Sequence, residues 1–205
     1  HSDHIAGLQQ LLKRFDIPVY TKQGTWREIQ DKLVVPKNQL IELTKGSLTL
    51  GNLIVEPFAV SHDAADPIGI NVFSGNDKAT VVTDTGIISD DILHRLDDST
   101  LLVLEANYDP HMLRFGPYQP FLKQRVASDE GHLSNEMAAQ ALLMMKRPDF
   151  MQVILAHRSE NNNNAVLVTQ TIGKMLVDGG VRIGPEMKLQ HGQPNEIVSM
   201  QSVKR

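Results

Sequence analysis

Apolar residues recur at helical spacing in several segments of the chain. Ile5, Leu8, Leu12 and Phe15 predict a helix after Asp3, whose carboxylate could cap it. The stretch "TWRE" at residues 25–28 has the form of a capping box and predicts the start of a second helix. Further helices are predicted over residues 90–96 after a serine, 135–147 after a second serine, and 164–177 before a Gly-Gly stop.

Short apolar runs predict strands between these helices. Residues 47–60, "SLTLGNLIVEPFAV", predict two strands around a Gly-Asn turn, and "GINVF" and "ATVVT" predict a hairpin around "SGNDK". The runs "LLVLE" at 101–105 and "QVILA" at 152–156 are almost continuously apolar, as is typical of strands buried on both faces. Strands followed by helices indicate a layered fold that mixes α and β structure.

Polar side chains stand where these apolar runs end. His62 follows the run that ends in "EPFAV", and Asp84 follows "ATVVT". Glu105 ends "LLVLE", and His157 follows "QVILA". Because ligands bind at the carboxyl ends of the strands in layered α/β folds, we expect these side chains to meet at one rim of the sheet.

Imidazole and carboxylate groups are the donors that zinc, manganese and iron accept, and a carboxylate can bridge two such cations. A bridged pair of cations polarises a phosphoryl oxygen and supplies an activated hydroxide at neutral pH, which suits phosphoester hydrolysis. Each residue also has a plainer interpretation when it is taken alone. His62 could be a hydrogen-bonded surface residue, Asp84 a turn residue and Asp3 a helix cap; it is the repetition of ligand types at strand ends that favours a metal site.

Composition narrows the remaining possibilities. The chain has no cysteine, which excludes disulfides and thiolate metal sites, and its net charge of −4 is unlike that of a dedicated nucleic-acid-binding domain. No apolar run is long enough to span a bilayer, and no signal-peptide pattern is visible, so we expect a cytoplasmic protein without a membrane partner. No linker or repeat divides the chain, which predicts one domain over residues 1–205.

The motifs resemble those of the metallo-β-lactamase superfamily. The opening "HSDHIAG" is similar to the second half of its H-x-H-x-D-H signature, and His62, Asp84 and His157 follow in the family's order. The stretches "SHDA", "TDTG", "LEAN", "LKQR", "GHLSN" and "HRSENN" are similar to those of the WalJ/YycJ-type hydrolases, which resemble the nuclease branch that contains tRNase Z and RNase J. The likeness covers essentially the whole chain and implies a four-layer αββα sandwich.

The resemblance also implies two divalent metal ions, which would be zinc or manganese, with iron as a third candidate. It assigns six ligands: His1, Asp3, His4, His62, Asp84 and His157. In the family another histidine stands two residues before the position of His1, after one or two strands. We therefore expect a chain truncated at its amino terminus, without the first strands of the sandwich, in which the site of His1, His62 and Asp84 binds its metal more weakly.

Catalytic roles follow from the same resemblance for His132, Glu105 and Asp3. His132 in "GHLSN" matches a histidine that assists proton transfer at the scissile phosphate, and Glu105 matches the acidic partner of that histidine. The alternative is that His132 helps to cap the helix that follows. Basic residues near the motifs could bind phosphate, or could simply be solvated: Arg114, Lys123, Arg125 and Arg158. Glu160 and Asn161 are expected to orient His157 without binding the metal themselves.

These expectations combine into a metal-dependent phosphodiesterase, most simply a DNA or RNA nuclease of the exonuclease type that uses a metal-activated hydroxide. Two alternatives remain open. The same fold could hydrolyse a small cyclic phosphodiester, lactone or thioester, because the superfamily carries many chemistries. The chain could also be an inactive metal-binding fragment.

Overall fold

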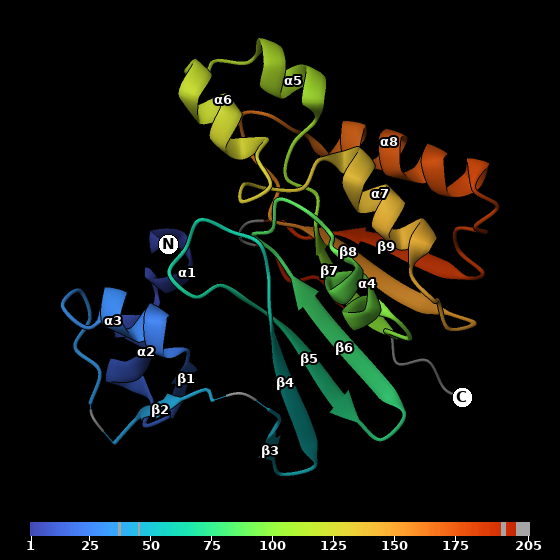
Figure 1. The fold of residues 1–205 in the computed structure, drawn as a ribbon. Coiled ribbons are helices and arrows are strands. Elements are labelled where there is room, and N and C mark those ends of the chain that lie inside the picture. Colours follow the sequence, from blue (N-terminus) through green and yellow to red (C-terminus); the bar gives the residue numbers. More distant parts are fainter. Residues whose placement is uncertain (37, 45, 194–195, 200–205) are drawn as a thin grey trace.

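The computed structural model describes residues 1–36, 38–44, 46–193 and 196–199. Its centre is a seven-stranded mixed sheet in the order β3-β4-β5-β6-β7-β8-β9 (Figure 1). The bounds of its strands are β3 Leu48–Leu50, β4 Leu53–Ala59, β5 Ile68–Ser74, β6 Asp77–Val82, β7 Leu101–Glu105, β8 Met151–Ala156 and β9 Met187–His191. The first four strands form an antiparallel meander, and β6 to β9 run parallel.

The predicted turns and hairpin are confirmed. Gly51 lies between β3 and β4 with φ +61°, and Gly75 lies between β5 and β6 with φ +57°. Both are left-handed backbone conformations that glycine adopts without a steric cost, which explains the sharp reversals there. β9 was not expected, because "MKLQH" alternates apolar and polar side chains at the edge of the sheet and lacks a continuous apolar run.

Three helices connect the parallel strands and pack on the sheet: α4 Asp90–Leu96, α7 Asn135–Met144 and α8 Ala165–Asp178. Each begins after a side chain that accepts a backbone N–H: Ser89 from Ile92, Ser134 from Met137, and Asn164 from Leu167. These caps match the predicted helix starts, because capping depends only on residues three positions apart.

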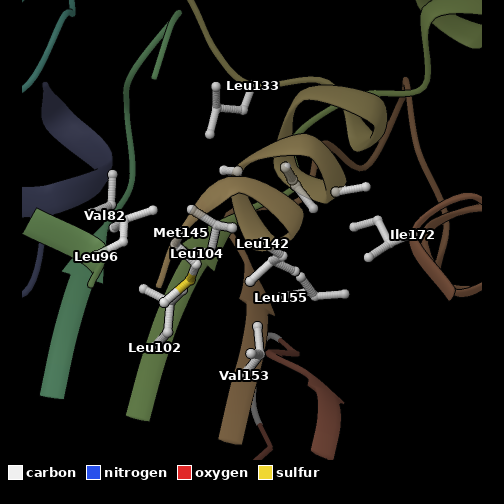
Figure 2. Packing of buried hydrophobic residues seen from close by; sticks show 14 of the residues in the cluster. Val82, Leu96, Leu102, Leu104, Leu133, Leu142, Met145, Val153, Leu155 and Ile172 are labelled. Carbon is white, nitrogen blue, oxygen red and sulfur yellow. The ribbon is translucent and has the colours of Figure 1, made fainter. Parts of the chain in front are cut away.

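The core lies between these helices and the parallel strands. Figure 2 shows Leu102 and Leu104 of β7 and Leu155 of β8 beneath Leu142 of α7 and Ile172 of α8. All five are at most 2% exposed, and burial of each such side chain contributes roughly 1.5–3 kcal/mol. This packing makes the sheet a rigid support for whatever stands at its strand ends.

The amino-terminal segment departs from the expected helices. It forms α1 Ser2–Ile5, α2 Leu8–Arg14, β1 Val19–Thr21, α3 Gln23–Ile29 and β2 Leu40–Glu42, with β1 and β2 as a separate parallel pair. Asp3 lies inside the first turn of α1 and does not cap the helix. The capping box is also wrong: α3 begins at Gln23, and the Thr25 hydroxyl donates to the Asp66 carbonyl at 3.2 Å. A tertiary contact has replaced the local one.

A pair of short helices between β7 and α7 was also not expected. α5 Pro110–Phe115 and α6 Pro120–Val126 each carry proline in the first turn, where no intrahelical N–H is needed. They stand apart from the sheet in Figure 1 and surround a small cluster of their own, made by Tyr108, Leu113 and Val126. In the described part of the chain, no helix is both long and apolar enough to cross a membrane.

Candidate active site

The strand ends meet as the sequence predicted. β6, β7 and β8 are parallel neighbours, so Asp84, Glu105 and His157 come to the same edge of the sheet. His62 follows β4, which runs in the same direction as β6 because β5 is antiparallel to both. Side chains that are 21 to 95 positions apart in the sequence therefore lie beside one another.

Two of these residues have an unusual backbone. Asp84 has φ +56° and His157 has φ +52°, in the left-handed region that side chains other than glycine rarely occupy. Among the described non-glycine residues, only Asp98 shares this property. Such strain is retained where the surrounding structure fixes the residue, and it concentrates at functional sites. Here it turns both side chains out of the strand direction at the rim.

Asp84 lies at the centre of the histidines. Its carboxylate is 3.0 Å from His4 Nε2, 3.4 Å from His62 Nε2 and 3.5 Å from His157 Nε2. Burial alone would raise the pKa of Asp84, but the hydrogen bond from His4 and the charges of His157 and His4 outweigh it. The pKa therefore lies well below its usual range, and the group is a carboxylate at any physiological pH.

A second group gathers on one side of Asp84. His62 Nε2 is 3.2 Å from His1 Nδ1 and 3.6 Å from Asp63 Oδ1, and His1 Nε2 is 3.5 Å from the same oxygen. His62 Nδ1 is 2.9 Å from the carbonyl oxygen of Gly131, an acceptor only, so Nδ1 carries the proton and donates. The lone pair of a neutral His62 is consequently on Nε2, which points to this group.

A third group gathers on the other side. His157 Nε2 is 3.6 Å from Asp3 Oδ2, and His4 Nε2 is 3.5 Å from the same oxygen. The structure therefore brings together Asp3, His4, Asp84 and His157, which are scattered along the sequence. Asp3 and His4 reach this position from α1, which buries none of its residues.

Glu105 connects the two histidines behind the site. Its carboxylate is completely buried; Oε1 is 2.8 Å from both His132 Nδ1 and His157 Nδ1. Oε2 accepts the backbone N–H groups of Thr85 and Leu133, each at 3.2 Å. Each carboxylate oxygen therefore already accepts two hydrogen bonds. Glu105 lies close enough to Asp84, His132 and His157 to form a metal-ligand group with them, but its oxygens are occupied, so it supports the ligands and does not bind metal itself.

This arrangement shifts two pKa values in opposite directions. Burial would raise the pKa of Glu105, but its hydrogen bonds with His132 and His157 outweigh burial and lower it. Burial would lower the pKa of His157, but the hydrogen bond and charge of Glu105, together with Asp84, raise it to about 9. Each group therefore stabilises the charged form of the other.

His132 lies in the same cluster, with Nδ1 on Glu105 and 4.0 Å from Asp84 Oδ1. The alternative role as a helix cap does not hold, because Ser134 caps α7. His132 also lines a cavity of about 510 Å³, together with His157 and Asp84. This cavity opens between the strand ends and α6.

The predicted phosphate-binding residues are only partly collected there. Arg125 and Arg158 line the 510 Å³ cavity. Arg125 also forms a two-pronged ion pair with Asp63, in which Nη2 donates to Oδ1 at 2.8 Å. Arg114 is not among the lining residues; its guanidinium lies over the Phe115 ring at 5.3 Å from the ring centroid.

The chain is similar to known proteins over most of its length. Residues 1–157 match the family model described as "Beta-lactamase superfamily domain". The chain is 34% identical over 205 residues to the exodeoxyribonuclease YycJ of Bacillus anthracis, which covers 99% of this chain and 78% of that protein. It is 31% identical over 200 residues to the exodeoxyribonuclease WalJ of Streptococcus pneumoniae strain D39, which covers 95% and 74%. The chain belongs to the metallo-β-lactamase superfamily.

Solved structures confirm the predicted fold class of this superfamily. The metallo-β-lactamase fold protein YhfI from Bacillus subtilis has a TM-score of 0.66 at 15% identity, over 94% of this chain and 71% of that one. Zn²⁺-bound PqqB from Methylobacterium extorquens has a TM-score of 0.63 at 16% identity, over 93% and 66%. The WalJ/YycJ-type resemblance is confirmed as well, and the chain is a metal-dependent hydrolase.

The residues fit the divalent metal ions that the metallo-β-lactamase fold implies. Two groups of three residues could each hold one ion, because the donor atoms within each group lie within 4.8 Å of one another. One group is His1, His62 and Asp63, and the other is Asp3, His4 and His157. All of these donors are imidazole nitrogens or carboxylate oxygens, which suit zinc, manganese and iron. Asp84 lies between the two groups, where a bridging carboxylate would be needed.

Sequence reasoning missed two supporting residues. Asp63 stands inside the quoted "SHDA", yet its place beside His1 and His62 depends on its long-range pairing with Arg125. Asn107 in "LEAN" donates from Nδ2 to the carbonyl oxygen of His157 at 2.7 Å, which holds the strained residue in place. A polar residue two or three positions after a predicted strand was the available signal for both.

The support that was expected from Glu160 and Asn161 stays a prediction. Both line the 510 Å³ cavity, and Asn161 Nδ2 is 3.5 Å from the Tyr118 hydroxyl. The contacts that hold His157 in the structure come from Glu105 and Asn107.

Proposed function

We propose that this chain is a metal-dependent phosphodiesterase that removes nucleotides from DNA, acting as one hydrolase domain over residues 1–205. One observation carries the proposal: Glu105 holds a metal-ligand candidate, His157, and a proton-transfer candidate, His132, through the same carboxylate oxygen. This arrangement would hold a proton carrier beside the metal ligands, where it could protonate the departing oxygen and so accelerate phosphodiester cleavage. The names of the relatives YycJ and WalJ, both exodeoxyribonucleases, support DNA as the substrate.

Two divalent cations, of zinc, manganese or iron, are proposed to bind on either side of Asp84. His1, His62 and Asp63 would hold one, and Asp3, His4 and His157 the other. Bound there, the cations would supply positive charge to the phosphoryl group and lower the pKa of water. His62 would use Nε2, because Gly131 fixes its Nδ1 proton, and His157 would use Nε2 because Glu105 occupies Nδ1.

His132 is proposed to deliver a proton to the departing oxygen. Its Nδ1 is held by Glu105, which leaves Nε2 as the atom that can exchange a proton with the substrate. Its side chain lines the 510 Å³ cavity, so a phosphodiester in this cavity could be reached by it. Arg158 and Arg125 in the wall of the cavity would bind phosphate oxygens, which the planar guanidinium matches in shape.

The test is hydrolysis by the purified protein supplied with zinc or manganese. End-labelled DNA, end-labelled RNA and bis(p-nitrophenyl) phosphate serve as substrates. His132→Ala is expected to retain metal and to lower kcat by about 10²–10⁴-fold, as is typical when a proton-transfer group is removed. His157→Ala is expected to lose both metal and activity. His94→Ala is the matched control, since His94 is exposed on α4 and pairs with Asp97.

The outcomes separate the candidate functions. Cleavage of DNA in preference to RNA supports the proposed exodeoxyribonuclease, and the reverse would change the substrate. Cleavage of the small diester alone would indicate a small-molecule hydrolase. If the metal-loaded protein leaves all three substrates intact, the proposal fails.

A further inference from the structure

The segment from Pro110 to Ala127, which contains α5 and α6 and is called here the helical arm, differs in charge from the rest of the chain. It carries three permanent cations, Arg114, Lys123 and Arg125, and no carboxylate, whereas the whole chain has a net charge of −4. Arg125 is paired with Asp63, so Arg114 and Lys123 are the cations left to attract a polyanion, and the segment itself contains no acidic group to repel it.

Two aromatic side chains of the helical arm face solvent. Phe115 is 67% exposed and Phe121 is 71% exposed, although two other apolar residues of the arm, Leu113 and Val126, pack with Tyr108 in a buried cluster. The centroids of the Phe115 and His111 rings are 4.6 Å apart. The Cζ atom of Arg114 lies over the Phe115 ring, 5.3 Å from its centroid. Flat rings that are exposed and flanked by basic groups are the elements of a single-strand-binding surface.

The helical arm is continuous with the proposed active site. Tyr118, Leu122 and Arg125 of the arm line the 510 Å³ cavity that contains His132 and His157. Arg158 lies in the wall of the same cavity. Its Nη1 atom is buried, and no hydrogen-bond acceptor meets it among the described residues. A buried donor without an acceptor is costly unless a ligand supplies one, and a phosphate oxygen would do so.

We propose that the helical arm holds a single-stranded segment of nucleic acid and feeds it to the strand-end site. Phe115 and Phe121 stack on bases, while Arg114 on the arm and Arg158 in the cavity bind backbone phosphates. In a duplex the base faces are already stacked and cannot meet these rings, so the surface selects unpaired nucleotides. The absence of carboxylates in the arm favours a nucleic acid over a protein partner. The inference rests on the proposed function.

The first test measures binding, so that it does not depend on turnover. A fluorescein-labelled phosphorothioate oligonucleotide, which resists cleavage, is titrated with the metal-loaded protein in single-stranded and in duplex form. Phe115→Ala and Phe121→Ala are each expected to weaken single-strand binding by roughly fivefold or more, and the double variant by roughly 30-fold. Phe→Tyr at either position should restore binding, whereas Phe→Leu should not. Phe15→Ala, at a phenylalanine that is 52% exposed outside the arm, is the control.

Two further measurements distinguish stacking from charge. An abasic oligonucleotide has phosphates but no bases, so both alanine variants should bind it as the unmodified protein does. Arg114→Ala should lower the slope of log K against log salt by about 0.7, the value for one phosphate contact on a single strand. The kcat/KM for bis(p-nitrophenyl) phosphate should stay unchanged in the Phe115 and Phe121 variants, because this diester is too small to reach either ring.

The inference is overturned if the alanine variants bind single strands as tightly as the unmodified protein, or if Leu and Tyr replacements behave alike. Equal losses on the abasic oligonucleotide would also overturn it. In each case the exposed rings would serve another partner, such as a protein. Failure of the proposed function has a different signature: no substrate is cleaved, whatever the arm variants do in the binding assay.

Discussion

Replacing Glu105 with glutamine changes the charge of one buried group and almost nothing of its shape. The carboxylate accepts four hydrogen bonds, two on each oxygen. An amide has one oxygen and one NH₂ group. If the oxygen faces His132 and His157, the NH₂ group opposes the N–H donors of Thr85 and Leu133; if it is turned around, the two imidazole Nδ1–H donors lose their acceptor. Either orientation leaves two donors unsatisfied.

The magnitude follows from the burial of this group. A hydrogen bond to a charged group contributes about 1.5–3 kcal/mol, and Glu105 is completely buried. Loss of two such bonds should lower the free energy of unfolding by about 3 kcal/mol or more. Because Glu105 orients the imidazole of His157, the affinity for metal should also fall, by roughly 10–100-fold, which is usual when a residue behind a ligand is changed.

Urea denaturation and titration with zinc, each performed on Glu105→Gln and on the unmodified protein, measure the two effects. Glu42→Gln is the control, since Glu42 is an exposed glutamate on β2. Unchanged stability together with unchanged metal affinity would refute the reasoning, because it would mean that the four contacts do not hold the site. A loss of stability without a loss of metal affinity would separate Glu105 from the metal ligands.

Three other predictions concern metal, backbone and pH. Removal of metal by a chelator should lower Tm, and adding the metal back should restore Tm. The reason is that a ligand present at 100 times its Kd stabilises the folded state by about 2.7 kcal/mol. A Tm that does not change would count against a metal site. Gly131→Ala should lower the free energy of unfolding, measured in urea, by about 1–3 kcal/mol, because the new Cβ would overlap the carbonyl oxygens of Arg125 and Val126. Gly7→Ala is the control and should leave this free energy unchanged, because the space around Gly7 is open. Burial lowers the pKa of His191 below 6.5, so protonation disfavours the folded state, and stability should fall as the pH drops below 6.5. This fall should be smaller in His191→Gln, and an identical pH profile for both proteins would contradict it.

The parts of the fold that could be read from the sequence are those fixed by local rules. β7 and β8 are apolar runs buried on both faces, and α4, α7 and α8 begin at side chains that cap within three residues. The capping box at Thr25 failed because its hydroxyl found a partner 41 residues away, at Asp66. Long-range contacts of this kind leave no periodic pattern in the chain.

In the site, too, features set by local sequence could be predicted and those set by long-range contacts could not. The positions of Asp84, Glu105 and His157 could be predicted because each stands at the end of an apolar strand, and parallel strands end together. The contact of Glu105 with His132 was implied by the family resemblance. Its second contact, with His157, could not be predicted, since it depends on the register of β7 against β8 and on the left-handed backbone of His157. The assignment of His132, Asp3 and His4 came from the family resemblance and not from any spacing.

The two halves of the site are held by different forces. Asp84 and His157 stand on strands whose apolar core fixes them, while Asp3 and His4 stand on α1, which has four residues and buries none of them. Ile5 of α1 is only half-buried, so hydrophobic burial contributes little to the attachment of this helix. The ion pair between His4 and Asp84 is partly exposed and contributes at most about 1 kcal/mol. A cation that takes ligands from both halves would provide most of the attachment. In such a site, metal binding and the docking of α1 on the sheet would be linked equilibria, because a cation bound by ligands from both halves would stabilise the docked position of α1.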